Sequence, residues 1–173
     1  MRIIAGRWRG HAIKAPRGRG VRPTTDRVRE AWMGSLMPRL PGAVVLDLFA
    51  GSGALGLEAL SRGAEHVVFV ERAKGALDAL EANVAALGAR DEVRIVRADA
   101  LKALDRLESE HFDLAVADPP YGEGWEVRLL ERFLAQPFAR EFWVEHRSRD
   151  PVPEDPRIEQ RRYGDTTLTH LFA

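Results

Sequence analysis

Four consecutive residues, Asp118-Pro119-Pro120-Tyr121, combine groups that suit chemistry on an amino nitrogen. An exocyclic amine of guanine, adenine or cytosine is a poor nucleophile because its lone pair is delocalised into the ring. The Asp118 carboxylate and the Pro119 carbonyl can accept its two hydrogens and aim the lone pair at a methylsulfonium. Tyr121 offers a face on which an extruded base can stack. Asp-Pro-Pro is also common in surface turns, but its place at the end of a predicted strand favours a catalytic role for all four residues.

A glycine-rich loop, residues 51–56, follows a strongly apolar run at 43–50. Its glycines allow a sharp turn close to a ligand, and the next helix presents its N-terminal amides there. The Gly51-x-Gly53-x-x-Gly56 spacing is also the dinucleotide fingerprint, so a nicotinamide oxidoreductase and a turn with incidental glycines are alternatives. Asp47 suits a cationic amino group, and Asp99 adds a carboxylate where an adenine ring would lie. These two residues favour S-adenosylmethionine as cofactor and S-adenosylhomocysteine as product.

A further carboxylate, Glu71, ends the second apolar run. Its two oxygens can accept both hydroxyls of a ribose, although a solvated charge at a strand end is an alternative interpretation. Glu145 or His146, at the end of the fifth predicted strand, can line the same pocket. No His, Asp or Glu cluster has the spacing of a metal site, so we expect no metal. The candidate cofactor-binding residues are Asp47, Phe49, Gly51, Ser52, Gly53, Glu71, Arg72, Asp99 and Ala100.

The charge of the chain is zero overall but unevenly distributed. Residues 1–30 hold nine basic side chains and two acidic ones, so the remaining residues are net acidic. A basic arm on an acidic body favours binding to a nucleic-acid backbone, and a solvated charge run is the alternative. The candidate nucleic-acid-binding residues are Arg2, Arg7, Trp8, Arg9, Lys14, Arg17, Arg19, Arg22 and Arg27.

Apolar runs and amphipathic stretches alternate from residue 43 onward, which predicts an α/β fold with a doubly wound, mostly parallel sheet. A basic β-hairpin over 2–14, turning near Gly10, and a helix from a Thr24 or Thr25 cap to Leu36 are expected before it. Gly164-Asp165 predicts a closing antiparallel hairpin at 157–172. The predicted strands are 43–50, 66–71, 93–99, 112–120 and 142–146, and the predicted helices are 54–62, 73–87, 100–108 and 126–135.

The absence of cysteine excludes disulfides, Cys-ligated metals and a thiolate nucleophile of the kind that methylates pyrimidine carbon 5. Transfer to an amino nitrogen needs no covalent catalysis. No apolar run is long enough for a membrane span, and basic residues interrupt the N-terminus where a signal peptide would be apolar. We therefore expect a cytoplasmic protein without a membrane partner.

Four motifs in order, RIIAGRWRG at 2–10, RPTTDRVRE at 22–30, LDLFAGSGALGLEALSRGA at 46–64 and DPPY at 118–121, resemble the bacterial RsmD-type 16S rRNA guanine-N2 methyltransferases. The resemblance covers nearly the whole chain. It implies a seven-stranded Rossmann-like methyltransferase domain at 41–173 and an RNA-binding extension at 1–40. It also implies one guanine of 16S rRNA in the small ribosomal subunit as the substrate. We expect the protein to be a monomer.

The resemblance implies roles for individual residues as well. The loop residues Asp47, Phe49, Gly51 and Gly53 would hold the methionine part of the cofactor, Glu71 the ribose and Asp99 the adenine. Residues 118–121 would hold the target guanine. The same tetrad occurs in DNA adenine-N6 methyltransferases, which remain an alternative, as does a non-catalytic RNA-binding assembly factor with this fold.

Overall fold

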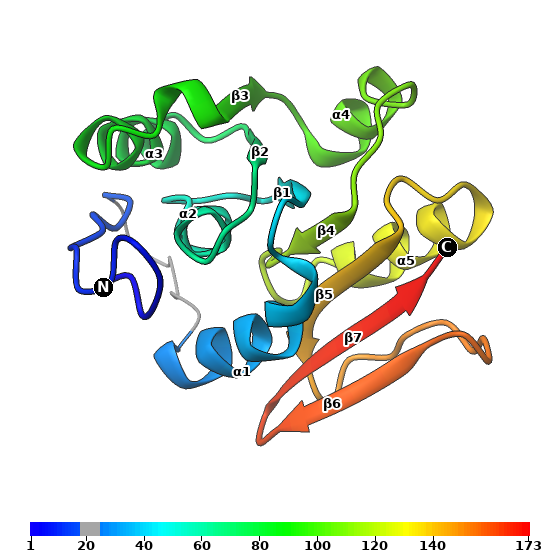
Figure 1. Ribbon diagram of the computed structural model, residues 1–173. Helices are drawn as coiled ribbons and strands as arrows, with labels where there is room; N and C mark the ends of the chain where they lie inside the picture. Colours follow the sequence, from blue (N-terminus) through cyan, green and yellow to red (C-terminus); the bar gives the residue numbers. More distant parts are fainter. Residues whose placement is uncertain (18–24) are drawn as a thin grey trace.

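The computed structural model describes residues 1–17 and 25–173, and a seven-stranded sheet forms its centre (Figure 1). The strand order is β3-β2-β1-β4-β5-β7-β6, in which β1 to β5 are parallel and β7 pairs antiparallel with both β5 and β6. The strands are β1 (Val44–Leu48), β2 (His66–Glu71), β3 (Val93–Arg97), β4 (Leu114–Ala117), β5 (Glu141–Arg147), β6 (Glu159–Tyr163) and β7 (Thr166–Phe172).

Helices cover both faces of the sheet because its central strands are apolar on both sides. Figure 1 shows the N-terminal segment, α1, α2 and α3 on one face and α4 and α5 on the other. The helices are α1 (Asp26–Leu36), α2 (Ala54–Ser61), α3 (Lys74–Ala86), α4 (Ala100–Arg106) and α5 (Trp125–Ala135), with short 3-10 turns at Met37–Arg39 and Arg90–Glu92. Along the described residues no helix is long and apolar enough to cross a membrane.

Strand order reverses between β1 and β4, since β2 and β3 lie on one side of this pair and β5 on the other. In open parallel sheets, ligands bind outside the carboxyl ends of the strands at such a switch point. The glycine loop follows β1 and the Asp118 tetrad follows β4. Topology therefore brings the two predicted chemical motifs to one edge of the sheet.

The predicted strands and helices from residue 43 to the C-terminal hairpin are confirmed, with shifts of a few residues at their ends. The largest shift is in the fourth strand, which ends at Ala117 because two prolines cannot continue the ladder. The helix predicted before the sheet is also confirmed: Thr25 caps it by accepting a hydrogen bond from the Val28 amide. Thr24, the other predicted cap, lies outside the described residues.

The predicted hairpin at 2–14 is wrong as a pair of regular strands. Its ends do pair antiparallel, through one bridge between Arg2 and Ala12 and a hydrogen bond from the Ile3 amide to the His11 carbonyl. Between these ends the chain forms a wide loop, and several of its amides donate hydrogen bonds to side chains of α2. The amides of Ile4 and Ala5 donate to the carboxylate of Glu58 on α2, so they cannot join a strand ladder.

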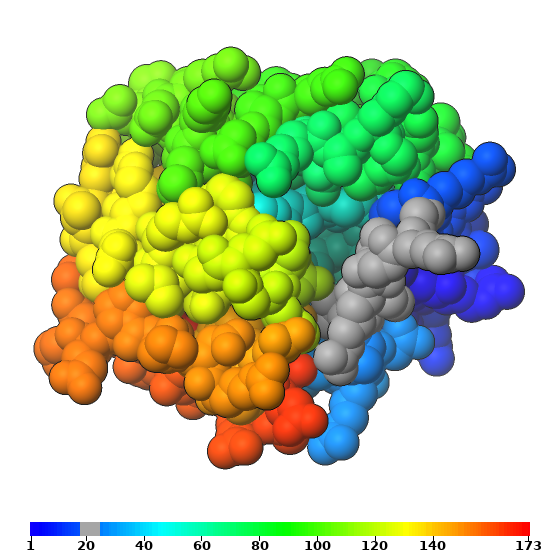
Figure 2. Space-filling view, turned by 180° about the vertical axis from the view of Figure 1, so that it is seen from behind, coloured from blue at the N-terminus to red at the C-terminus, as the bar shows by residue number. Residues whose placement is uncertain are grey.

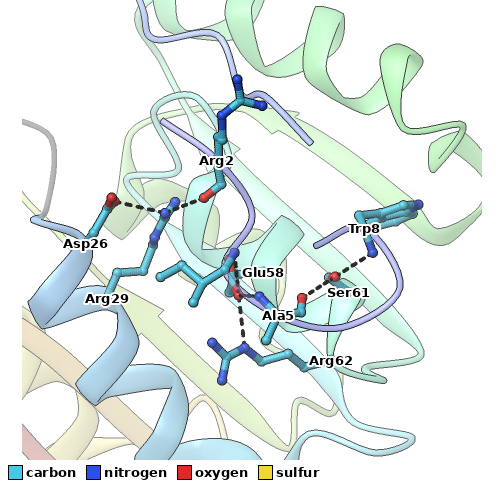
Figure 3. A network of polar contacts seen from close by, with 9 residues as sticks. Arg2, Ala5, Trp8, Asp26, Arg29, Glu58, Ser61 and Arg62 are labelled. Carbon is cyan, nitrogen blue, oxygen red and sulfur yellow. Dashed lines mark hydrogen bonds and ion pairs between the residues drawn. The ribbon is translucent and has the colours of Figure 1, made fainter. Parts of the chain in front are cut away.

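Helix α2 clamps this N-terminal segment through two side chains (Figure 3). Glu58 is fully buried, and besides the two amides it accepts a hydrogen bond from Arg62 Nε at 3.0 Å. Ser61 Oγ donates to the Ala5 carbonyl at 2.6 Å and accepts from the Trp8 amide at 3.0 Å. The segment is thus fixed to the body by a closed polar network.

The contact at Gly6 gives a first prediction. Gly6 and Gly10 both have a positive φ, of 86° and 83°, but a Cβ on Gly6 would lie 1.9 Å from the Ser61 carbonyl oxygen, whereas one on Gly10 would meet none of the described residues within 4 Å. Gly6→Ala should therefore cost about 1–3 kcal/mol more stability than Gly10→Ala. Urea unfolding measures both variants. Equal losses would contradict the docking of this segment on α2.

Candidate active site

A cleft of about 740 Å³ opens at the carboxyl edge of the sheet. Figure 2 shows a hollow on this side, between the cyan and green surface of the β1–α3 region and the yellow-green surface of the segment that leads into α5. Its walls include the glycine loop, the ends of β2 and β5, and residues 118–121. The volume is within the range of small-molecule sites.

The loop after β1 is held in a fixed and partly strained shape. Phe49 has a φ of 56°, and elsewhere in the described residues a positive φ is found only at glycines. The Asp47 carboxylate accepts a hydrogen bond from the Gly56 amide at 3.0 Å. A Cβ on Gly56 would lie 2.3 Å from the Phe69 ring, so glycine is needed for α2 to pack this closely on β2. These contacts set the direction in which α2 leaves the loop.

Asp47 lies beneath the loop rather than on the cleft wall, with only 1% of its surface exposed. Burial raises its pKa from 3.8 to about 8; the hydrogen bond from Gly56 opposes this shift, and the nearby charge of Glu71 adds to it. A contact between Asp47 and a cationic ligand stays a prediction. The contact that the structure shows is the one that orients α2.

The raised pKa of Asp47 predicts a pH-dependent stability. The unfolded chain releases this proton near 3.8, whereas the folded chain keeps it to about 8, so the contribution of Asp47 to stability falls as pH rises across that interval. Asp47→Asn cannot titrate and keeps an oxygen for the Gly56 amide. Its stability relative to wild type should rise from about pH 5 to about pH 8, by at most about 1.4 kcal/mol per pH unit. Urea unfolding across this range tests the effect, and parallel profiles would contradict it.

Glu71 is oriented by three backbone amides. Gly51 N donates to its Oε2 at 2.8 Å, while the amides of Arg72 and Ala73 donate to its Oε1 at 2.8 and 2.9 Å. A carboxylate has about four lone-pair sites, so these three bonds leave capacity for one further donor, on Oε2. Glu71 can therefore accept a hydroxyl group at the cleft wall.

Asp99 follows β3 and caps α4, where its Oδ1 accepts from the Leu101 amide at 3.1 Å. Its other oxygen lies 3.6 Å from Arg72 Nη1. Both residues line the cleft, together with three small apolar side chains that leave room for a flat ring: Val70, Ala98 and Ala100. The structure brings six of the nine candidate cofactor-binding residues to the cleft wall. The other three, Asp47, Ser52 and Gly53, are buried and do not line the cleft.

All four residues of the tetrad line the cleft. The Tyr121 hydroxyl donates a hydrogen bond to Glu145 Oε1 at 2.6 Å and lies 3.5 Å from Thr166 Oγ1. Burial and the bond to Glu145 raise the pKa of Tyr121, so its hydroxyl stays protonated. The guanidinium of Arg147 stands 5.0 Å from the centre of the same ring. The hydroxyl and one face of the Tyr121 ring therefore both have a partner.

Several cleft residues were not predicted, or only in part. Glu145 lines the cleft, whereas His146, the other residue considered, faces the opposite side and contacts Thr169 Oγ1 at 2.6 Å. Alternation along β5 separates the two, and it also brings Arg147 to the side of Glu145. Knowledge of the strand register was needed to choose between them.

The predicted nucleic-acid-binding residues divide into groups. Arg17 lines the cleft, and Arg9, Lys14 and Arg27 are exposed. Arg7 pairs with Glu92 at 2.5 Å and stands 4.0 Å above the half-buried ring of Trp8. Arg2 donates to the Gly10 carbonyl at 2.7 Å. Arg19 and Arg22 lie outside the described residues. Among the described residues, no group of three His, Asp or Glu side chains is arranged to hold a metal.

The fold and site together define a Rossmann-like methyltransferase. The methyltransferase domain of METTL16 shares the fold, with a TM-score of 0.74 over 95% of this chain and 73% of that one at 14% identity. The chain belongs to the family described as "Conserved hypothetical protein 95", whose model matches residues 1–171. The resemblance to RsmD-type proteins inferred from the motifs is thereby confirmed.

Two proteins are similar to this chain over most of its length. Ribosomal RNA small subunit methyltransferase D of Escherichia coli (strain K12) is 43% identical over 134 residues, which are 76% of this chain and 67% of that protein. The structure of a hypothetical protein from Thermus thermophilus is 32% identical, with a TM-score of 0.87 over 100% of this chain and 99% of that one.

Proposed function

We propose that this protein transfers a methyl group from S-adenosylmethionine to the exocyclic N2 of a guanine in 16S rRNA of the small ribosomal subunit. The observation that carries the proposal is that the Asp118 tetrad and the glycine loop face one cleft across the switch point, in a relative of a small-subunit rRNA methyltransferase. A nicotinamide oxidoreductase has no need for the tetrad beside the loop.

The donor set of the cleft fits S-adenosylmethionine. Apart from the two chain neighbours of Gly51, none of the described residues lies within 4 Å of where its Cβ would be, so the loop backbone is open to a ligand. The methionine part would lie against Phe49 and Gly51, with Asp47, Ser52 and Gly53 behind them supporting the loop. Glu71 would accept a ribose hydroxyl beside Arg72, and Asp99 would face the adenine beside Ala100. The cofactor supplies an electrophilic methyl group and leaves as S-adenosylhomocysteine.

The tetrad would position the other reactant. The Asp118 carboxylate and the Pro119 carbonyl accept the two N2 hydrogens, which makes the nitrogen lone pair available for the new C–N bond. The methylated nitrogen then gives up one proton, to Asp118 or to water. Tyr121, held by Glu145 and Arg147, provides the stacking surface.

The RNA would be bound by the N-terminal extension, residues 1–40, with residues 41–173 as the methyltransferase domain. Exposed Arg9, Lys14 and Arg27 suit phosphate contacts, and Arg17 at the cleft would guide the strand toward the tetrad. In this proposal the protein acts as a cytoplasmic monomer. Binding should weaken steeply with salt, as it does when phosphate contacts dominate.

Transfer of labelled methyl groups to three acceptors tests the proposal. Unmodified small ribosomal subunits, naked 16S rRNA and duplex DNA are each incubated with the protein and labelled S-adenosylmethionine. The proposal expects label on subunits or rRNA. Label on DNA would favour an adenine-N6 DNA enzyme, and cofactor binding without any transfer would favour a non-catalytic assembly factor. Calorimetric binding of NADH in place of S-adenosylmethionine would overturn the cofactor assignment.

A further inference from the structure

The tetrad does not by itself select a base. Asp118 and the Pro119 carbonyl accept the hydrogens of an exocyclic amine, and guanine, adenine and cytosine all carry one. Selection of guanine therefore needs other groups that read the rest of its Watson–Crick edge. That edge has an N1–H donor beside the N2 amine and an O6 acceptor beyond it, whereas adenine has an N1 acceptor and an N6 donor.

Two side chains on β5 lie where such groups are required. Ala117 of β4 pairs with Val144 of β5, so Asp118 and Glu145 are the next residues on neighbouring strands. Adjacent strands are about 4.8 Å apart. Glu145 and Arg147 face the same side of β5, and both line the cleft. An acceptor and a donor thus follow Asp118 along the wall of the cleft.

The Tyr121 ring connects these two residues to the base-binding surface. Its hydroxyl donates to Glu145 Oε1 at 2.6 Å, and the Arg147 guanidinium is 5.0 Å from the ring centre. The guanidinium lies over one face of the ring, so a base stacked on that face, beside the guanidinium, would have its edge close to both groups. Glu145 is only 3% exposed, and charge-assisted hydrogen bonds are strong where water is excluded.

We propose that Glu145 and Arg147 determine the specificity for guanine, Glu145 by accepting the N1–H and Arg147 by donating to O6. This inference rests on the proposed function and names the groups that select its substrate. Adenine, with its N6 amine at the tetrad, would bring the N1 lone pair against the carboxylate and only a C2–H group against the guanidinium. The first contact would become repulsive and the second hydrogen bond would be lost. Sites built on such hydrogen bonds reject analogues that lack the donor by large factors.

A substrate analogue separates this role from a structural one. RNA with 2-aminopurine at the target position keeps the N2 amine but has an N1 acceptor and no O6. We expect wild type to favour guanine over 2-aminopurine by at least about 100-fold in kcat/KM. Glu145→Gln keeps an oxygen for the Tyr121 hydroxyl but offers an amide donor to N1, so the preference should fall by at least about tenfold. Arg147→Met should lower it too, and Arg149→Met, at an exposed site beyond β5, is the control.

The outcomes distinguish the inference from the function on which it rests. If Glu145 only holds Tyr121, Glu145→Gln leaves the preference unchanged and Tyr121→Phe slows both substrates alike; that result overturns the inference. The wild-type measurement needs no variant, and equal use of guanine and 2-aminopurine would also overturn it. Absence of transfer to guanine by wild type would instead overturn the proposed function, and the inference with it.

Discussion

Replacing Asp118 by alanine is expected to lower kcat for methyl transfer by about three orders of magnitude while S-adenosylmethionine and RNA still bind. The carboxylate lies at the cleft, directly after β4, and no other side chain in the described part of the cleft can take over both its charge and its position. Binding should persist because the glycine loop, Glu71 and the basic side chains are untouched. Single-turnover kinetics, calorimetry for the cofactor and filter binding for RNA measure the three quantities.

Asp105→Ala is the matched control for this variant, because Asp105 is an exposed aspartate on α4. It should leave all three quantities unchanged. Equal loss of turnover and RNA binding in Asp118→Ala would mean that Asp118 binds RNA rather than orients the amine. Full activity of Asp118→Ala would remove the tetrad from the reaction.

Removing the Glu58 carboxylate from α2 is expected to lower the stability of the protein strongly, because this carboxylate attaches the N-terminal segment. Glu58→Ala leaves a buried Arg62 without its carboxylate and two amides, of Ile4 and Ala5, without their acceptor. Breaking a buried pair from one side costs about 3–5 kcal/mol, which for a chain of this size lowers Tm by roughly 10 °C. Calorimetric melting measures the effect.

The same change should detach the N-terminal segment before the body unfolds. Trypsin is then expected to cleave after Arg7 and Arg9 in Glu58→Ala at temperatures where wild type is intact. RNA affinity should fall by about tenfold as the basic side chains lose their fixed positions. Glu81→Ala, at an exposed position on α3, should change stability by no more than about 0.5 kcal/mol. If trypsin cleaves Glu58→Ala no faster than wild type, the hydrogen bonds to Glu58 are not what holds the N-terminal segment.

The sheet was predictable from the sequence because its strands are apolar on both faces and are separated by amphipathic helices. Gly164-Asp165 similarly predicted the hairpin of β6 and β7, which the structure confirms. The sequence did not show that β7 would lie between β5 and β6, because strand order depends on contacts between segments far apart in the chain. It also did not show that amides near the N-terminus would pair with Glu58.

The candidate site was predictable where a motif coincides with the end of a strand. Glu71, Asp99 and residues 118–121 follow parallel strands, and the structure brings them to one cleft. Residues on β5 were harder, since a one-residue change of register exchanges Glu145 with His146. Asp47 illustrates a different limit: its carboxylate is turned to the Gly56 amide, a partner that residue type and spacing do not reveal.

The chemical identity of the methylated nucleoside shows whether the protein acts on the N2 of a guanine. RNA labelled by wild-type protein and labelled S-adenosylmethionine is digested to nucleosides, and the label is assigned by chromatography and mass spectrometry. Our account predicts that the label is recovered as N2-methylguanosine from 16S rRNA and is absent with Asp118→Ala. Recovery as N6-methyladenosine, or on a pyrimidine, would contradict the assignment of the tetrad and of Glu145 and Arg147 to a guanine.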